Sequence, residues 1–99
     1  MAANEFRLSE LLPGKVRVVT VDGESVAVFN IQGKYYAIDD YCSHAGGPLS
    51  EGALDGQTIV CPWHGSCFDV TTGAVQCGPA RQPVKTYQVV IEGEMGKVS

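Results

Sequence analysis

The middle of this 99-residue chain contains no lysine or arginine. Residues 35–80 carry five acidic side chains and no basic one, and the whole chain has a formal net charge of -4. A protein that holds a nucleic acid needs clustered basic side chains to neutralise the phosphates. We therefore expect no nucleic-acid partner. The five acids are Asp39, Asp40, Glu51, Asp55 and Asp69.

The sequence also lacks an apolar run long enough to cross a membrane, which takes about 20 residues in a helix. Its start, MAANEFRLSE, has neither the basic residues nor the apolar stretch of roughly 7 to 15 residues that marks a secretory signal. These absences predict a soluble, cytoplasmic protein with no membrane partner.

Helical periodicity over about ten residues is missing as well. Alternating and β-branched residues instead predict short strands, separated by turn sequences such as Asp22-Gly23 and Gln32-Gly33. The expected strands are 5–8, 15–21, 24–31, 34–38, 58–61, 67–70, 85–92 and 95–98. Frequent turns between short strands are typical of an all-β fold, here an antiparallel sandwich or barrel.

The length of the chain suits one domain over residues 1–99. Within it, we expect base sheets from about 1–39 and 81–99. The segment of about 40–80 differs from its flanks because it holds all four cysteines and both histidines. It is interpreted as a small loop-rich subdomain set on the sheets.

The histidines and two of the cysteines form close pairs. Cys42 and His44 are two apart, Cys61 and His64 are three apart, and sixteen residues separate the pairs. Short Cys/His spacings joined by a longer excursion are typical of two loops that converge on a metal. The sequence therefore predicts a metal site made by these four side chains. From spacing alone, a structural zinc ion and an iron–sulfur centre both remain open.

Cys67 and Cys77 lie outside these pairs. Each is five residues from Thr72, so a hairpin turning at Thr71-Thr72-Gly73 would place them nearly opposite each other. A disulfide is possible there, but a cytosolic chain favours free thiols that pack against their neighbours. We expect free thiols and assign neither residue as a ligand.

The paired motifs resemble one family specifically. Cys42-Ser43-His44 and Cys61-Pro62-Trp63-His64-Gly65-Ser66 are similar to the ligand motifs of Rieske proteins, which hold a [2Fe-2S] cluster by two cysteines and two histidines. Gly78-Pro79-Ala80 resembles the family's proline loop, which covers the cluster from the side. The resemblance implies that Cys42 and Cys61 bind the inner iron, and that His44 and His64 bind the outer one. It also implies that Ser66, Pro79 and Trp63 surround the cluster.

Two departures separate the chain from the high-potential respiratory members of that family. Phe68 stands where those proteins have a tyrosine, and Gly47 and Trp63 occupy the positions of their inter-loop disulfide. The resemblance then implies the soluble, lower-potential ferredoxin type. We expect a potential near the low end of the Rieske range, roughly -150 mV.

A one-electron carrier is the function that this resemblance implies, rather than an enzyme. Size and motif are most similar to the ferredoxin component of bacterial dioxygenase systems of aromatic hydrocarbon catabolism. Such a protein passes electrons from an NADH-dependent flavin reductase to a terminal ring-hydroxylating oxygenase. Two alternatives remain: the Rieske-like small subunit of an assimilatory nitrite reductase, and a structural zinc module that binds a protein.

Overall fold

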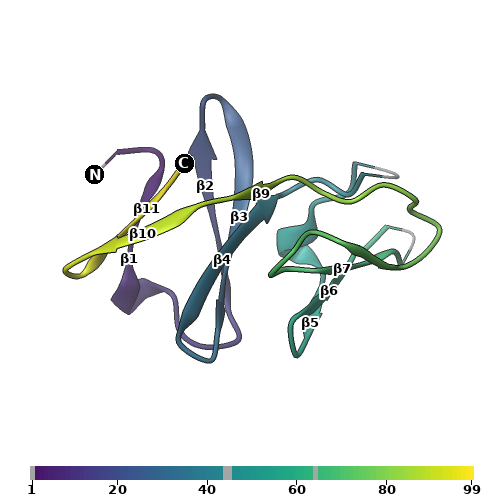
Figure 1. Cartoon of the computed structure of the whole chain (residues 1–99), viewed down its shortest axis with the longest axis horizontal. Coiled ribbons are helices and arrows are strands. Elements are labelled where there is room, and N and C mark those ends of the chain that lie inside the picture. Colours follow the sequence, from purple (N-terminus) through teal and green to yellow (C-terminus); the bar gives the residue numbers. More distant parts are fainter. Residues whose placement is uncertain (1, 44–45, 64) are drawn as a thin grey trace.

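The computed structural model describes residues 2–43, 46–63 and 65–99. In this part of the chain the strands are short, antiparallel and gathered in three sheets, with the orders β2-β3-β4-β9, β1-β11-β10 and β5-β6-β7-β8 (Figure 1). The expected all-β antiparallel fold is confirmed. The strands are β1 (Glu5–Arg7), β2 (Val16–Val21), β3 (Glu24–Ile31), β4 (Lys34–Asp39), β5 (Ala53–Asp55), β6 (Thr58–Val60), β7 (Cys67–Asp69), β8 (Val75–Cys77), β9 (Thr86–Tyr87), β10 (Val89–Glu92) and β11 (Met95–Val98), with short 3-10 helices η1 (Leu8–Glu10) and η2 (Leu49–Glu51).

Two tight hairpins build the central sheet. Asp22 and Gly23 join β2 to β3, and Gln32 and Gly33 join β3 to β4. All four residues have positive φ, between 50° and 90°, which is the backbone of the two-residue turns that match the twist of antiparallel strands. Both predicted turns are therefore confirmed.

The structure differs from the expected strands in two places. The strands β5 and β8, of three residues each, are absent from the expected set. The expected strand 85–92 is divided into β9, which pairs with β4, and β10, which pairs with β11. The division falls at Gln88, whose backbone exchanges two hydrogen bonds with Ser99 as the chain passes from one sheet to the other.

The central strand β3 is buried on both faces, because successive side chains of a strand point to opposite sides of the sheet. Val26 and Val28 pack in one buried group, with residues of β1 and β11 such as Phe6 and Val98. Ala27 and Phe29 pack in the other. This second group lies toward the β5–β8 sheet and includes two of the predicted ligands, Cys42 and Cys61.

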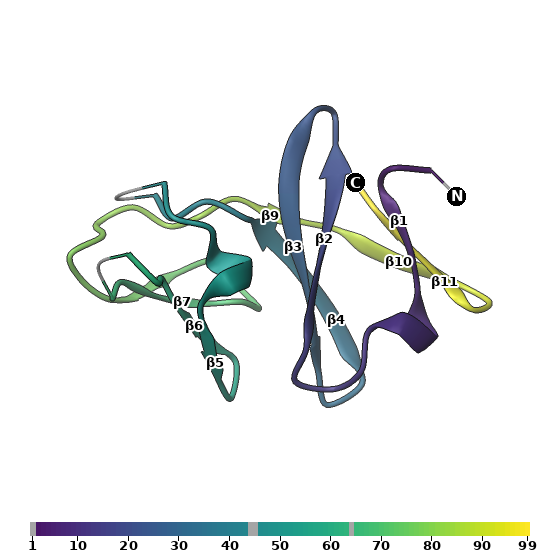
Figure 2. The ribbon, with the colours of Figure 1, turned by 180° about the vertical axis from the view of Figure 1, so that it is seen from behind.

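Both views show the sheet β5-β6-β7-β8 at one end of the molecule, and β1, β10 and β11 at the other (Figures 1 and 2). The chain ends lie on the side of β1 and β11, away from the loops that contain the predicted ligands. Among the described residues there is no helix with the length and apolar character needed to span a membrane.

Candidate metal centre

Two of the four predicted ligands fall in the described part of the chain. Cys42 and Cys61 are placed, whereas His44 and His64 lie outside the described residues. The arrangement of the site is therefore built below from the two cysteines and the backbone around them.

Cys42 begins a closed loop, called loop 1 here (residues 41–48). A bridge between Tyr41 and Pro48 joins its two ends. Inside the loop, the Cys42 N–H donates to the carbonyl oxygen of Gly47 at 2.9 Å, and the Gly46 N–H donates to the carbonyl oxygen of Cys42 at 2.9 Å. Gly46 has a φ of 72°, a conformation that glycine adopts without steric cost.

Cys61 begins a second loop of the same design, called loop 2 (residues 61–66). Its N–H donates to the carbonyl oxygen of Ser66 at 2.7 Å, and the Gly65 N–H donates to the carbonyl oxygen of Cys61 at 3.1 Å. Gly65 has a φ of 77°, close to that of the glycine four residues after Cys42 in loop 1. Cys42 and Cys61 thus stand at corresponding positions of two loops that are closed by the same two backbone bonds.

The two loops meet through their cysteines and Gly47. Cys42 and Cys61 are both buried, and they belong to one buried group with Leu49 and Phe68. A Cβ atom added at Gly47 would lie 3.0 Å from the Cys61 sulfur and 2.8 Å from the Trp63 ring. Only glycine lets the backbone of loop 1 approach loop 2 this closely. The contact occupies the positions at which respiratory Rieske proteins would have their disulfide.

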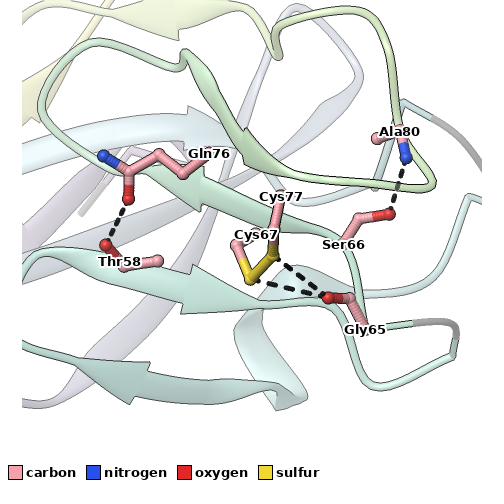
Figure 3. Close-up of a disulfide and its surroundings, with 7 residues drawn as sticks. All are labelled: Thr58, Gly65, Ser66, Cys67, Gln76, Cys77 and Ala80. Atoms are coloured by element: carbon pink, nitrogen blue, oxygen red, sulfur yellow. Dashed lines mark hydrogen bonds between the residues drawn. A yellow bond between two sulfur atoms is a disulfide. The ribbon is translucent and has the colours of Figure 1, made fainter.

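Ser66 joins loop 2 to the predicted proline loop (residues 78–80). The Ala80 N–H donates to the Ser66 hydroxyl oxygen at 3.0 Å, and both residues are buried (Figure 3). Because the hydroxyl accepts this bond, its own proton is left to donate to another acceptor. That arrangement is compatible with the expectation that Ser66 lies beside the cluster, where its hydroxyl proton would be available as a donor.

A second link to this region comes from Ser43, which sequence reasoning did not single out. Its hydroxyl donates to the carbonyl oxygen of Gln82 at 2.5 Å, across 39 residues of chain. In the sequence, Ser43 stands between the predicted ligands Cys42 and His44, and this position is the one signal that marks it as part of the site. Nothing in the local sequence indicates that its partner is Gln82. The proline loop is therefore held to loop 2 through Ser66. Gln82, two residues after the proline loop, is held to loop 1 through Ser43.

The surface beside the loops is apolar. Trp63 is 58% exposed and Tyr41 is 49% exposed, whereas Pro79 is exposed and Pro48 is partly buried. We call the surface of Pro48, Trp63 and Pro79 the apolar tip, and Tyr41 is an additional exposed aromatic residue beside it.

Three of the five acids are used inside the fold. Asp40 is buried and accepts the Ser50 N–H, and Asp39 accepts the Tyr87 hydroxyl at 2.7 Å. Burial, together with that bond to Asp39, raises the pKa of Tyr87 to about 12. Asp69 is also buried: burial raises its pKa, but hydrogen bonds from Thr71 and from Gln57 outweigh this and leave the pKa below its ordinary value.

These contacts limit which of the five acids are available to attract a partner. Asp40 and Asp69 are buried and hold turns, so they have no free carboxylate to offer a partner. Glu51 and Asp55 are exposed and remain available for that role.

The structure also corrects the expectation for the two remaining cysteines. Cys67 and Cys77 are opposite each other in the β7–β8 hairpin, as predicted. They are joined by a disulfide, so the expectation of free thiols is wrong. The preference for free thiols came from the cytosolic setting, whereas the hairpin register places the two Cα atoms 4.8 Å apart, within reach of a disulfide.

Comparison with known proteins gives a family and close relatives. The model of the Rieske [2Fe-2S] domain matches residues 4–88. Over 85 residues the chain is 45% identical to the ferredoxin component of the naphthalene 1,2-dioxygenase system from Pseudomonas putida, a match that covers 86% of this chain and 82% of the relative.

Solved structures give the same fold. The ferredoxin of carbazole 1,9a-dioxygenase from Nocardioides aromaticivorans IC177 superimposes with a TM-score of 0.92 at 37% identity, over 97% of this chain and 94% of that one. A structure described as the complex of reduced oxygenase and oxidized ferredoxin in carbazole 1,9a-dioxygenase matches with a TM-score of 0.89 at 35% identity, over 94% and 96% of the two chains.

Proposed function

The chain belongs to the Rieske [2Fe-2S] domain family, and from that premise we propose that it is a one-electron carrier for a terminal ring-hydroxylating dioxygenase. The observation that carries the proposal is its 45% identity, over most of both chains, to a dioxygenase ferredoxin component. A second ferredoxin at 35% identity is known in complex with its oxygenase, which supports the same direction of transfer.

The proposed ligands are Cys42 and Cys61 for the inner iron and His44 and His64 for the outer iron. Two buried thiols at the starts of two matching loops fit the cysteine half of this donor set. With protein ligands and sulfides filling both irons, the group would supply one-electron transfer and leave no ligand position for a substrate. Around it, Ser66 offers a hydroxyl proton, and Phe68 contributes only apolar contact.

On this proposal, a flavin-dependent reductase that oxidises NADH supplies the electrons. Because NADH is a cytoplasmic reductant, we place the carrier in the cytoplasm. Both partners would meet the surface of Trp63, Tyr41, Pro48 and Pro79, which lies beside the loops that bear the proposed ligands. Contacts between transient redox partners are usually small, under about 1,200 Å², so the exposed Glu51 and Asp55 would help to bring a basic partner to this tip.

Reconstitution tests the proposal. The purified ferredoxin is combined with NADH, a flavin reductase and a terminal oxygenase taken from one dioxygenase system, and hydroxylated product is measured as the ferredoxin concentration is varied. We expect product to depend on the ferredoxin. A Trp63→Ala variant should form less product than wild type at the same limiting ferredoxin concentration. Glu92→Gln, an exposed change at the far end of the molecule, should form as much product as wild type.

Each alternative has its own outcome. Zinc in place of iron and sulfide, with no visible absorption, would assign the structural zinc module. Delivery of electrons to the large subunit of a nitrite reductase, with no product from any oxygenase, would assign the other alternative and overturn this proposal.

A further inference from the structure

The Cys67–Cys77 disulfide lies between two segments of the candidate metal centre. Strand β7 starts at Cys67, directly after loop 2, and β8 ends at Cys77, directly before the proline loop. The bond therefore joins the point where the chain leaves loop 2 to the point where it enters the proline loop (Figure 3). Electron transfer as proposed above makes no use of this bond.

The disulfide is beside the hydrogen bond that holds the proline loop in place. Ser66, which accepts the Ala80 N–H, directly precedes Cys67, and Ala80 follows Cys77 by three residues. The carbonyl oxygen of Gly65 lies 3.5 Å from both sulfurs. In the disulfide neither sulfur carries a proton, so these contacts become hydrogen bonds only when the sulfurs are thiols.

Small molecules can reach the bond. Both cysteines are partly exposed, and their neighbours Gly65, Gln76 and Gly78 are exposed. In a cytoplasmic protein, moreover, a disulfide is usually transient, catalytic or redox-sensing, because the thiol pool is reducing. The Cys67–Cys77 disulfide is therefore open to reduction, next to a loop that bears a proposed metal ligand, and is not only a fixed structural cross-link.

We propose that Cys67 and Cys77 form a thiol-exchange site whose partner is a dithiol reductant, and that its redox state sets how firmly the proline loop is held on loop 2. A thiolate of the dithiol attacks one sulfur, which breaks the S–S bond and forms a mixed disulfide. The second thiolate of the dithiol then attacks the dithiol's first sulfur, which is bonded to the protein in that mixed disulfide. This step breaks the mixed disulfide and releases the protein cysteine. Two electrons and two protons reach Cys67 and Cys77, and the dithiol becomes a disulfide.

Reduction removes the covalent tie between β7 and β8 but leaves Ser66 and Ala80 unchanged. The reduced thiols donate to the carbonyl oxygen of Gly65, a weaker restraint than a covalent bond. The Ser66–Ala80 hydrogen bond then opens more often, and the Ala80 amide exchanges its proton with water faster. The proline loop is firm in the oxidised form and looser in the reduced one.

The experiment uses the whole protein with its cluster, and dithiothreitol as the dithiol. Alkylation with iodoacetamide followed by peptide mass spectrometry measures the state of Cys67 and Cys77. Hydrogen–deuterium exchange measures opening in peptides that cover residues 78–82. The double variant Cys67→Ser with Cys77→Ser represents the reduced form, and Thr58→Val, which removes the neighbouring Thr58–Gln76 hydrogen bond, is the matched control.

We expect both cysteines to be protected from alkylation in air-equilibrated protein and to be alkylated after dithiothreitol. Exchange in residues 78–82 should rise at least about threefold on reduction. The double variant should match reduced wild type and show no further response to dithiothreitol, which separates loss of the disulfide from any direct effect of the reagent. Thr58→Val should match oxidised wild type.

Three results would overturn the inference: alkylation of both cysteines without reductant in air-equilibrated protein, a bond that dithiothreitol does not reduce, or reduction with unchanged exchange. If the double variant does not fold, wild type with and without dithiothreitol still decides. The inference takes only its cytoplasmic reductant from the proposed function. Both readouts are made on the carrier alone, so they are independent of whether an oxygenase accepts its electrons.

Discussion

The Ser66 hydroxyl oxygen accepts the Ala80 N–H at 3.0 Å in the interior of the protein, and this bond connects loop 2 to the proline loop. Ser66 is fully buried, and Ala80 is nearly so. One side chain therefore has two tasks, because its oxygen holds the proline loop while its proton is free to stabilise charge beside it.

Replacing Ser66 by alanine should change both stability and potential. The Ala80 N–H would be left buried without an acceptor, which costs about 1–3 kcal/mol in the free energy of unfolding. Loss of the hydroxyl donor disfavours the more negative reduced state, so the midpoint potential should fall, by the order of 50 mV. Urea unfolding and protein-film voltammetry measure the two effects. Ser66→Thr keeps the hydroxyl and should retain the midpoint potential of the wild type. A midpoint potential as low in Ser66→Thr as in Ser66→Ala would refute the donor role.

Phe68→Tyr should have the opposite effect on the potential. Phe68 is fully buried in the same group as Cys42 and Cys61, so a hydroxyl added there would reach toward a ligand sulfur and stabilise the reduced state. We expect a rise of the order of 50 mV, with a loss of stability of about 1–3 kcal/mol from overpacking. Phe6→Tyr, in the other buried group, is the control and should not change the potential. An unchanged or lower value for Phe68→Tyr would count against the argument.

Gly47→Ala should weaken retention of the cluster. The added Cβ would meet the Trp63 ring at 2.8 Å and the Cys61 sulfur at 3.0 Å, so loops 1 and 2 must separate. We expect a stability loss of about 1–3 kcal/mol and a faster decay of the visible absorption on warming. Gly78→Ala is matched, because a Cβ there meets no atom within 4 Å. Equal decay of both variants would show that the close approach of the loops is unimportant.

Changing His64 to cysteine tests the proposed ligand set. A thiolate in place of a neutral imidazole adds one formal negative charge, which opposes the arrival of an electron. We expect part of the protein to keep an iron–sulfur cluster, with a midpoint potential lower by about 100 mV or more. His44→Cys should behave in the same way. Iron and sulfide analysis with EPR checks the outcome, and wild-type protein that contained zinc and no sulfide would refute the assignment.

The exposed acids predict a salt dependence of electron delivery. Glu51, three residues after loop 1, and Asp55, at the β5–β6 turn, are both exposed, so they should speed the encounter with a basic partner more than they tighten the complex. Raising the ionic strength from about 0.01 to 0.5 M should slow second-order transfer about tenfold. Glu51→Gln with Asp55→Asn should flatten this dependence, whereas Glu92→Gln with Glu94→Gln, at the far end, should not. Stopped-flow rates independent of salt in the wild type would leave the apolar tip as the sole docking determinant.

Much of the fold could be predicted from the sequence, and a candidate ligand set could be proposed from it, because the signals are local. The turns at Asp22-Gly23 and Gln32-Gly33 depend on two adjacent residues that adopt positive φ, and the strands on either side depend on alternation. The Cys/His pairs are short spacings of the same kind. The opposition of Cys67 and Cys77 was predicted by counting outward from one turn, and the structure reaches it through a register shift between Cys67 and Phe68.

What only the tertiary structure decided concerns contacts between distant segments. The bonds from Ser43 to Gln82 and from Ala80 to Ser66 span 39 and 14 residues, and their partners depend on how the loops pack over the sheet. Asp40 looked the same in the sequence as the exposed Glu51, yet its carboxylate is buried and holds the Ser50 N–H. The sequence by itself thus determined the turns and the candidate ligand set, because those signals are local composition and spacing. Packing decided which neighbours restrain them, because burial and pairing are properties of the folded chain as a whole.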